Sequence, residues 1–398
     1  MLEILIMALF KSKESYLGVD IGTASIKLVE LAPWSGKPRL VTYGYVDIVT
    51  DIIHSKSAEN QIKIVNSLKK LLNQAQTNSN LAIAALPTYS VFNSIISLPE
   101  MSPKDLSSAV KWEAKKYIPM PLEEMILDWK VIKDEAAQGV QVQAQPDLNT
   151  GKPKGKAGFL NLKFGAKKPE GSKAEVELSN KGRGGDIRIL VTAAPKNLVG
   201  RYLEIFKQAG LKLLSLETEA FALARSLISN DLSTVMIVDI GSITTDICVI
   251  EKGIPILNRS IDIGGLTITK GIAGSLNVNL ERAEQFKRDF GVSVNQDDSQ
   301  KGINKTIANS LSPIINEIKY VFDLFHNQSS RPIEKIVLSG GSAFLPNLPD
   351  YFSQLFNKPT IIGNPWDKVV YPEELKTVLD EVGTRLAVAI GLAMRDIK

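Results

Sequence analysis

The chain has very few residues that form disulfide bonds or bind transition metals. Its 398 residues include one cysteine, Cys248, and two histidines, His54 and His326. A single cysteine excludes an internal disulfide and any cysteine-rich metal site, and two histidines leave little for a zinc cluster. The composition therefore favours a protein of the reducing cytoplasm.

The sequence also lacks a long hydrophobic run. The first ten residues, 1–10, are apolar but too short to span a bilayer, and no small-residue cleavage site follows them. We expect no export signal. Met7 begins a stretch, MALFKSKESYLG, that resembles a complete N-terminus. Residues 1–6 are therefore interpreted as a start-site extension.

Charge of one sign is not in large excess. The formal net charge is +4, and residues 135–186 hold most of that surplus, with nine basic and six acidic residues. A dedicated nucleic-acid binder needs a concentrated basic face, so the sequence argues against that class. A chain of this length, with 44% hydrophobic residues, predicts at least two domains with well-formed cores.

Residues 135–186 differ from the rest of the chain. They contain nine glycines, and residues 151–173 carry seven lysines and one glutamate. Such a composition cannot bury a core, so we predict a disordered insertion. The insertion is interpreted mainly as a solvated tether, and weak attraction to an anionic membrane surface or to acidic proteins is the alternative.

An internal repeat is the most informative feature. Residues 17–23, LGVDIGT, and residues 237–242, IVDIGS, are apolar strands that end in Asp-Ile-Gly-Thr/Ser and continue into a second apolar strand. Both predict hairpins. Two hairpins 219 positions apart predict two similar α/β halves that face each other, because a repeat array would show many short periods.

A helix with a marked start is predicted from Ser102. Ser102 is the expected N-cap, Pro103 the first residue, and Asp105 the partner in a capping box. Its spacing predicts a buried stripe made by Leu106, Val110 and Tyr117. Trp112 lies off that stripe, so it either packs on a neighbouring domain, which we favour, or faces a partner.

The two hairpin loops have the chemistry of a phosphate clamp. An aspartate at a strand tip, followed by glycine and hydroxyl residues, presents backbone N–H groups and a carboxylate to a phosphate-bound metal. The first loop offers Asp20, Gly22, Thr23, Ala24, Ser25 and Lys27, and the second offers Asp239, Gly241, Ser242, Thr244 and Thr245. In a third segment, IVLSGGSAFLP at 336–346, Gly340, Gly341 and Ser342 would let a purine or ribose lie against bare backbone.

These three loops, in this order, resemble the phosphate 1, phosphate 2 and adenosine motifs of the actin-like ATPase superfamily. The resemblance implies that the chain binds ATP with Mg²⁺, which Asp20 and Asp239 would hold through water. Lys27 matches the phosphate lysine of that superfamily. Glu284 and Lys287 match its contacts to ribose and adenine, and the alternative is that they belong to a solvated charged helix face. Glu219 is either the residue that orients the attacking water or only a carboxylate at a helix start.

Segments outside the loops resemble the PilM family of type IV pilus assembly proteins. The closest match is KWEAKKYIPMPLEE at 111–124, and residues 7–31, 85–102, 363–366 and 387–395 also fit. The resemblance covers nearly the whole chain except 135–186. It implies an α/β, actin-like fold of two ribonuclease-H-like lobes, with an inserted FtsA-like 1C domain of the SHS2 type.

The resemblance also implies a division into subdomains and a partner. Subdomain 1A would comprise 13–87, 212–233 and 379–398; 1C would comprise 88–211; 2A would comprise 234–265 and 335–378; and 2B would comprise 266–334. A groove between 1A and 1C would bind the cytoplasmic N-terminal peptide of a PilN-like inner-membrane protein. The chain would then act at the inner face of the cytoplasmic membrane, in a pilus or a type II secretion-like machine, with self-association and other pilus-base proteins as further contacts.

Two other functions share the fold. A small-metabolite kinase needs an additional Asp base near a polar sugar pocket, and no matching motif is found. An FtsA-like division protein would end in an amphipathic membrane helix, whereas this sequence stops at Lys398 directly after an apolar helix. At most a slow ATPase is expected, and the sequence leaves open whether ATP is hydrolysed.

Overall fold

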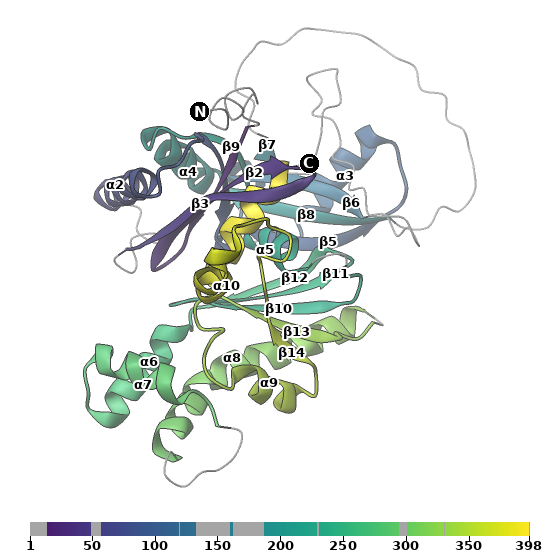
Figure 1. Cartoon of the computed structure of the whole chain (residues 1–398). Helices are drawn as coiled ribbons and strands as arrows, with labels where there is room; N and C mark the ends of the chain where they lie inside the picture. Colours follow the sequence, from purple (N-terminus) through teal and green to yellow (C-terminus); the bar gives the residue numbers. More distant parts are fainter. Residues whose placement is uncertain are drawn as a thin grey trace, which may run out of the picture.

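A computed structural model describes the fold over residues 14–48, 57–118, 120–132, 160–161, 187–228, 231–293, 301–329 and 331–397 (Figure 1). The apolar segment 1–10 and all of the predicted insertion 135–186 except residues 160–161 lie outside the described residues. Among the residues that the structure describes, no helix has both the length and the apolar character needed to cross a membrane.

The first half of the fold is built on a six-stranded sheet. Its strands are β1 (Tyr16–Ile21), β2 (Ser25–Trp34), β3 (Lys37–Asp47), β4 (Leu81–Leu86), β7 (Leu160–Asn161) and β9 (Lys212–Thr218). They lie in the order β3-β2-β1-β4-β9-β7. The central strands β1 and β4 pair in parallel and are almost wholly buried, as expected for a sheet covered on both faces.

The second half repeats this arrangement. Its strands are β10 (Val235–Ile240), β11 (Thr245–Glu251), β12 (Ile254–Ile261), β13 (Lys335–Ser339) and β14 (Thr360–Ile362). Their order, β12-β11-β10-β13-β14, has the same connectivity as β3-β2-β1-β4-β9 of the first sheet. The two similar α/β halves inferred from the hairpin repeat are therefore confirmed.

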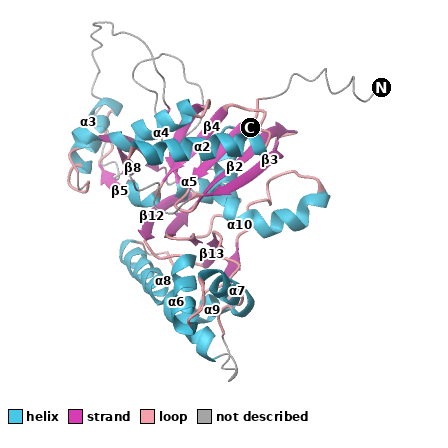
Figure 2. Ribbon diagram, turned by 90° about the vertical axis from the view of Figure 1, so that its left-hand side faces the viewer, coloured by secondary structure: helices cyan, strands magenta, loops and turns pink. Residues whose placement is uncertain are grey.

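Eight helices among the described residues belong to these two halves. The first half contains α2 (Ala58–Gln74), α4 (Lys196–Gln208), α5 (Glu219–Leu227) and α10 (Lys376–Ala393), and the second contains α6 (Gly265–Leu276), α7 (Leu280–Phe290), α8 (Lys301–Gln328) and α9 (Leu348–Phe356). Helices α5 and α10 lie between the sheets, and their side chains share one core with residues of both (Figures 1 and 2). Contact is tight, since a Cβ on Gly18 would lie 1.9 Å from the Ala389 carbonyl oxygen of α10.

A three-stranded sheet is inserted between β4 and β9. It consists of β5 (Phe92–Leu98), β8 (Ile187–Pro195) and β6 (Met125–Ile132) in the order β5-β8-β6, with α3 (Pro103–Ala114) packed on it. The Ser102 hydroxyl caps α3 by accepting a hydrogen bond from the Asp105 N–H at 3.3 Å. The predicted N-cap is therefore confirmed.

Two predictions for α3 are wrong. Tyr117 is 51% exposed, and Ala114 and Ile118 complete the buried stripe with Leu106 and Val110. Trp112 is 70% exposed, so it does not pack on a neighbouring domain, and Lys116 Nζ lies 4.7 Å from the centre of its ring.

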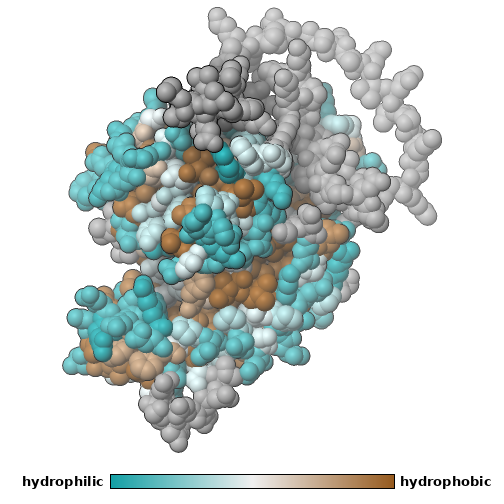
Figure 3. All heavy atoms as spheres, viewed as in Figure 1, coloured by the Kyte–Doolittle hydropathy of each residue, from teal (hydrophilic) through white to brown (hydrophobic). Residues whose placement is uncertain are grey.

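The insertion is not free of secondary structure either. Residues Leu160–Asn161 pair with Leu216 and Ser215 of β9 as the antiparallel edge strand β7. The prediction of disorder is therefore wrong for these two residues. On the face seen in Figure 3, polar and apolar side chains are mixed on the upper and lower bodies, and apolar side chains gather in the band between them.

Candidate functional site

The β1–β2 and β10–β11 loops have the same geometry. In the first hairpin Asp20 lies opposite Lys27, and the Gly22 N–H donates to the Ser25 carbonyl at 3.0 Å. In the second, Asp239 lies opposite Asp246, and the Gly241 N–H donates to the Thr244 carbonyl at 2.9 Å. The two turns are therefore equivalent, with one change of charge: the position of Lys27 is taken by Asp246.

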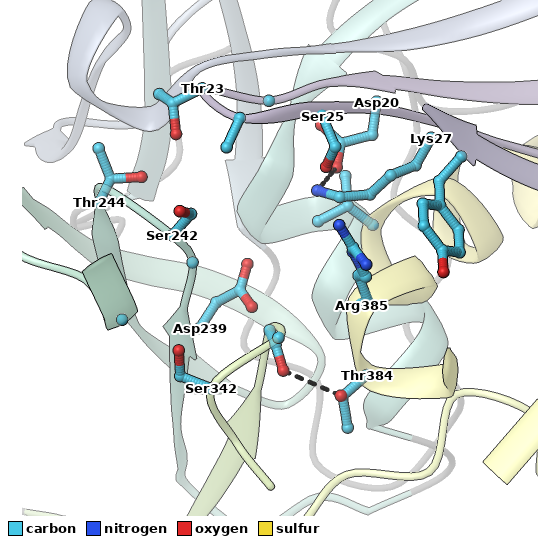
Figure 4. Close-up of a pocket in the computed structure, with 18 of the residues that line it drawn as sticks. Asp20, Thr23, Ser25, Lys27, Asp239, Ser242, Thr244, Ser342, Thr384 and Arg385 are labelled. Carbon is cyan, nitrogen blue, oxygen red and sulfur yellow. Dashed lines mark hydrogen bonds and ion pairs between the residues drawn. The ribbon is translucent and has the colours of Figure 1, made fainter. Parts of the chain in front are cut away.

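The two loops line one cleft of about 1150 Å³ between the halves. Figure 4 shows Thr23, Ser25 and Asp20 on one side of it, with Ser242, Thr244 and Asp239 on the other. The cleft brings together all but one of the residues selected from the sequence: Asp20, Gly22, Thr23, Ala24, Ser25, Lys27, Glu219, Asp239, Gly241, Ser242, Thr244, Glu284, Lys287, Gly340, Gly341 and Ser342.

Thr245 is the exception. Its side chain is fully buried, and its hydroxyl donates to the Ile263 carbonyl at 2.6 Å, so it holds the start of β11 against the loop between β12 and α6. Successive side chains of a strand point to opposite faces, and Thr244 faces the cleft. The expectation that Thr245 wraps a phosphate is therefore corrected.

Lys27 and Asp20 form a largely buried ion pair. Their Nζ and Oδ2 atoms are 2.8 Å apart, and the side chains are 17% and 5% exposed. Burial lowers the pKa of Lys27, but the charge and hydrogen bond of Asp20, together with the charges of Asp239 and Glu219, outweigh it, so the net pKa is raised. Lys27 therefore remains charged inside the cleft (Figure 4).

Three further carboxyl groups lie close to this pair and are protonated more readily than usual. Burial raises the pKa of Asp239 to about 6 and that of Asp246 to about 7. Burial, followed by repulsion from Asp246 and Asp20, raises the pKa of Glu219 well above its usual range. Asp239 Oδ1 also lacks a hydrogen-bond partner. Four carboxyl groups with Lys27 beside them make a site that would be stabilised by an added cation.

Glu219 is both a helix-start residue and part of the cleft. It is the first residue of α5, where the helix dipole favours a negative charge. Its Oε2 accepts hydrogen bonds from the Thr88 N–H at 3.1 Å and from the Thr88 hydroxyl at 2.7 Å. The two readings of Glu219 left open by the sequence are therefore compatible.

The far end of the cleft holds a second buried lysine. Lys287 Nζ lies 2.7 Å from Glu284 Oε2 and donates to the Gly265 carbonyl at 3.2 Å. Thr269 donates to the same carboxylate oxygen at 2.6 Å. Burial lowers the pKa of Lys287 against the opposing attraction of Glu284. This end offers fixed hydrogen-bonding groups from α6 and α7.

Sequence reasoning missed several lining residues. Asp246 could have been found, because it lies 219 positions after Lys27, at the same spacing as the two aspartates. Thr384 and Arg385 carried no motif. The Thr384 hydroxyl donates to the Gly340 carbonyl at 2.9 Å (Figure 4). Arg385 Nη2 lies 2.6 Å from Asp47 Oδ1, and both residues line the cleft. Helix α10 thereby links the first half to the Gly340 loop.

Comparison with known proteins assigns the family. The family model described as type IV pilus assembly protein PilM matches residues 18–144 and 175–397. The chain belongs to the PilM family. The unmatched stretch is 145–174, which is narrower than the 135–186 expected from the sequence. This PilM-family chain is thus a type IV pilus assembly protein.

Individual relatives agree on the fold. The chain is 25% identical to a chain of the solved "PilM-PilN type IV pilus biogenesis complex", with a TM-score of 0.73 and coverage of 96% of this chain and 98% of that one. It is 23% identical to the cell division protein FtsA of Neisseria meningitidis serogroup B, over 96% of this chain and 90% of that protein. It is 26% identical to the ethanolamine utilization protein EutJ of Escherichia coli, over 39% of this chain and 49% of that protein. With its two matching sheets, this PilM-family chain has the actin-like ATPase fold.

Proposed function

We propose that this PilM-family chain binds ATP with Mg²⁺ in the cleft and docks the cytoplasmic N-terminal segment of a PilN-like inner-membrane protein. The proposal of ATP binding rests on the two equivalent Asp-Ile-Gly turns, which face each other across one cleft. Binding of the nucleotide would change the affinity of the chain for this partner. The chain would act as an assembly factor at the inner face of the cytoplasmic membrane.

The phosphates would lie between the two turns. Backbone and hydroxyl groups of Thr23, Ser25, Ser242 and Thr244 line that space, and Lys27 supplies positive charge. The triphosphate brings negative charge toward carboxyl groups, so a divalent cation is needed to balance both. Among the described residues no three Asp, Glu, His or Cys side chains converge as a metal site. Mg²⁺ would therefore be held by the phosphates and by water bonded to Asp20 and Asp239.

The nucleoside would occupy the other end of the cleft. The ion pair of half-buried Glu284 and buried Lys287 would contact ribose and base there. The Gly340–Ser342 turn supplies the opposite wall, and space for a flat ring is open beside Gly341, where a Cβ would meet no atom within 4 Å.

The partner assignment rests on the family and on the solved PilM–PilN complex. The inserted three-stranded sheet would be subdomain 1C, and its junction with subdomain 1A would hold the peptide. The residue limits of subdomains 1A, 1C, 2A and 2B given above stay a prediction.

A fluorescence anisotropy titration tests both parts. A labelled synthetic peptide of the PilN-like N-terminal segment from the same organism is titrated with the protein, with and without ATP and Mg²⁺, beside a scrambled peptide. We expect saturable binding of the native peptide alone. If the peptide binds neither with nor without ATP, the partner assignment is rejected. The ATP-binding part of the proposal is not affected by that result, because a titration with labelled ATP measures it separately.

A further inference from the structure

A short turn connects the cleft to the inserted subdomain. β4 of the first sheet ends at Leu86, η1 (Thr88–Ser90) follows, and β5 of the three-stranded sheet begins at Phe92. The flanking residues Pro87 and Tyr89 line the cleft. The chain therefore passes from the cleft wall into the inserted subdomain within a few residues.

Thr88 lies at the centre of this turn and is nearly buried, with 9% of its surface exposed. Its N–H and hydroxyl both donate to Glu219 of α5, in the first half. Glu219 lines the cleft, so Thr88 ties the connection to the inserted subdomain to a carboxylate of the cleft wall.

The turn also has a packing contact with the second half. Both η1 and β5 pack against β12, the edge strand of the second sheet. Figures 1 and 2 both show β5 beside β12. A change in the angle between the halves would therefore move β12 against the inserted subdomain.

In the structure the Thr88 hydroxyl donates to the Glu219 carboxyl group. A phosphate-bound cation near this carboxyl group would compete for the same oxygen atoms, so occupancy of the cleft changes the strength of the bonds that hold η1 to α5. The turn can therefore be held to α5 or released from it, and occupancy of the cleft can select between these two arrangements.

We propose that Thr88 couples the occupancy of the cleft to the inserted three-stranded subdomain, so that Mg²⁺-bound ATP changes the affinity of that subdomain for its peptide. This inference rests on the proposed function and adds the residue that carries the regulation. Coupling of this kind is reciprocal, so the peptide changes the affinity for ATP by the same factor.

The test is a linkage measurement on the full chain. The peptide dissociation constant is measured with and without saturating ATP and Mg²⁺, and the ratio of the two is compared among wild type, Thr88→Val and Thr88→Ser. Thr42→Val is the matched control, since the Thr42 hydroxyl donates to the Ala75 carbonyl and neither residue lines the cleft. We expect a ratio of about fivefold or more in wild type, Thr88→Ser and the control. Thr88→Val should bring it to about one.

The outcomes separate the two proposals. A Thr88→Val protein that binds both ligands with the wild-type ratio overturns the inference, and so does a wild type that binds both with a ratio of one; in either case the proposed function stands. A wild type that binds neither ligand rejects both. Should Thr88→Val fail to fold, amide hydrogen exchange in wild-type β5 and α3 decides: ATP must change it, and an unchanged rate overturns the inference.

Discussion

Gly340 is the residue at which one added methyl group should do most damage to the proposed nucleotide site. Its φ is +84°, and a Cβ built there would lie 2.4 Å from the Ile240 carbonyl oxygen and 2.6 Å from Asp239 Oδ1. Both neighbours belong to the strand that carries the second Asp-Gly turn. Gly340→Ala would therefore push that strand and the Asp239 carboxylate out of place.

The magnitude follows from two contributions. A left-handed backbone costs a non-glycine residue about 1–2 kcal/mol. Overpacking against backbone that cannot rotate away costs about 1–3 kcal/mol. Together they give about 2–5 kcal/mol of lost stability. Displacement of Asp239 should in addition weaken ATP binding at least tenfold, which corresponds to about 1.4 kcal/mol.

Gly341→Ala is the matched control because its Cβ would meet no atom within 4 Å. Its thermal midpoint should equal that of wild type, although its ATP affinity should fall because the methyl group occupies cleft space. The assay is thermal unfolding with and without ATP and Mg²⁺, with an ATP titration for each protein. A Gly340→Ala protein as stable as Gly341→Ala would refute the reasoning.

Three further predictions concern charge and exposure. Lys27→Met leaves the buried Asp20 carboxylate without its partner and should lower the free energy of unfolding, measured by chemical denaturation, by about 3 kcal/mol. Lys63→Met removes an exposed ion pair on a helix and should change the free energy of unfolding by less than about 0.5 kcal/mol. Equal effects of the two substitutions would contradict the burial argument. The pKa of Asp239 is raised to about 6 and that of Asp246 to about 7. Between about pH 4 and about pH 7 the folded state therefore holds protons that the unfolded chain releases. The metal-free protein should accordingly lose thermal stability as pH rises through this range. Asp246→Asn should flatten that decline between about pH 4 and about pH 7, and a profile as steep as that of wild type would count against it. Trp112→Ala removes a side chain that is 70% exposed and should shift stability by no more than about 0.5 kcal/mol, so a loss of several kcal/mol would show that Trp112 is packed after all.

Local patterns predicted the two turns where they repeat. The two Asp-Ile-Gly turns could be read from the sequence because each follows a buried strand and both have the same spacing. Thr245 was wrongly assigned to the cleft. β11 begins at Thr245, and the side chains of consecutive residues point to opposite faces there, so only one of Thr244 and Thr245 can face the cleft.

Errors on α3 arose where a period was continued past the end of the helix. The α-helix stops at Ala114, and Pro119 disfavours helical backbone at Ile118, so Tyr117 leaves the buried stripe. Leu160 and Asn161 pair with β9 although their neighbours in the sequence are rich in glycine and lysine. Tertiary pairing of this kind leaves no local pattern.

Residues on α10 could not have been assigned to the site from the sequence. Thr384 and Arg385 reach the cleft because the helix packs between the two sheets, and their position depends on contacts with segments more than 40 residues away. The sequence shows only an apolar helix there.

Titration calorimetry of ATP into the protein, with Mg²⁺ and then with EDTA, tests the central claim most directly. One ATP per chain should bind with Mg²⁺, and Asp239→Asn should weaken that binding at least tenfold. If wild type releases no binding heat under either condition and also fails to retain labelled ATP, or if Asp239→Asn binds as tightly as wild type, the two turns do not form a phosphate clamp.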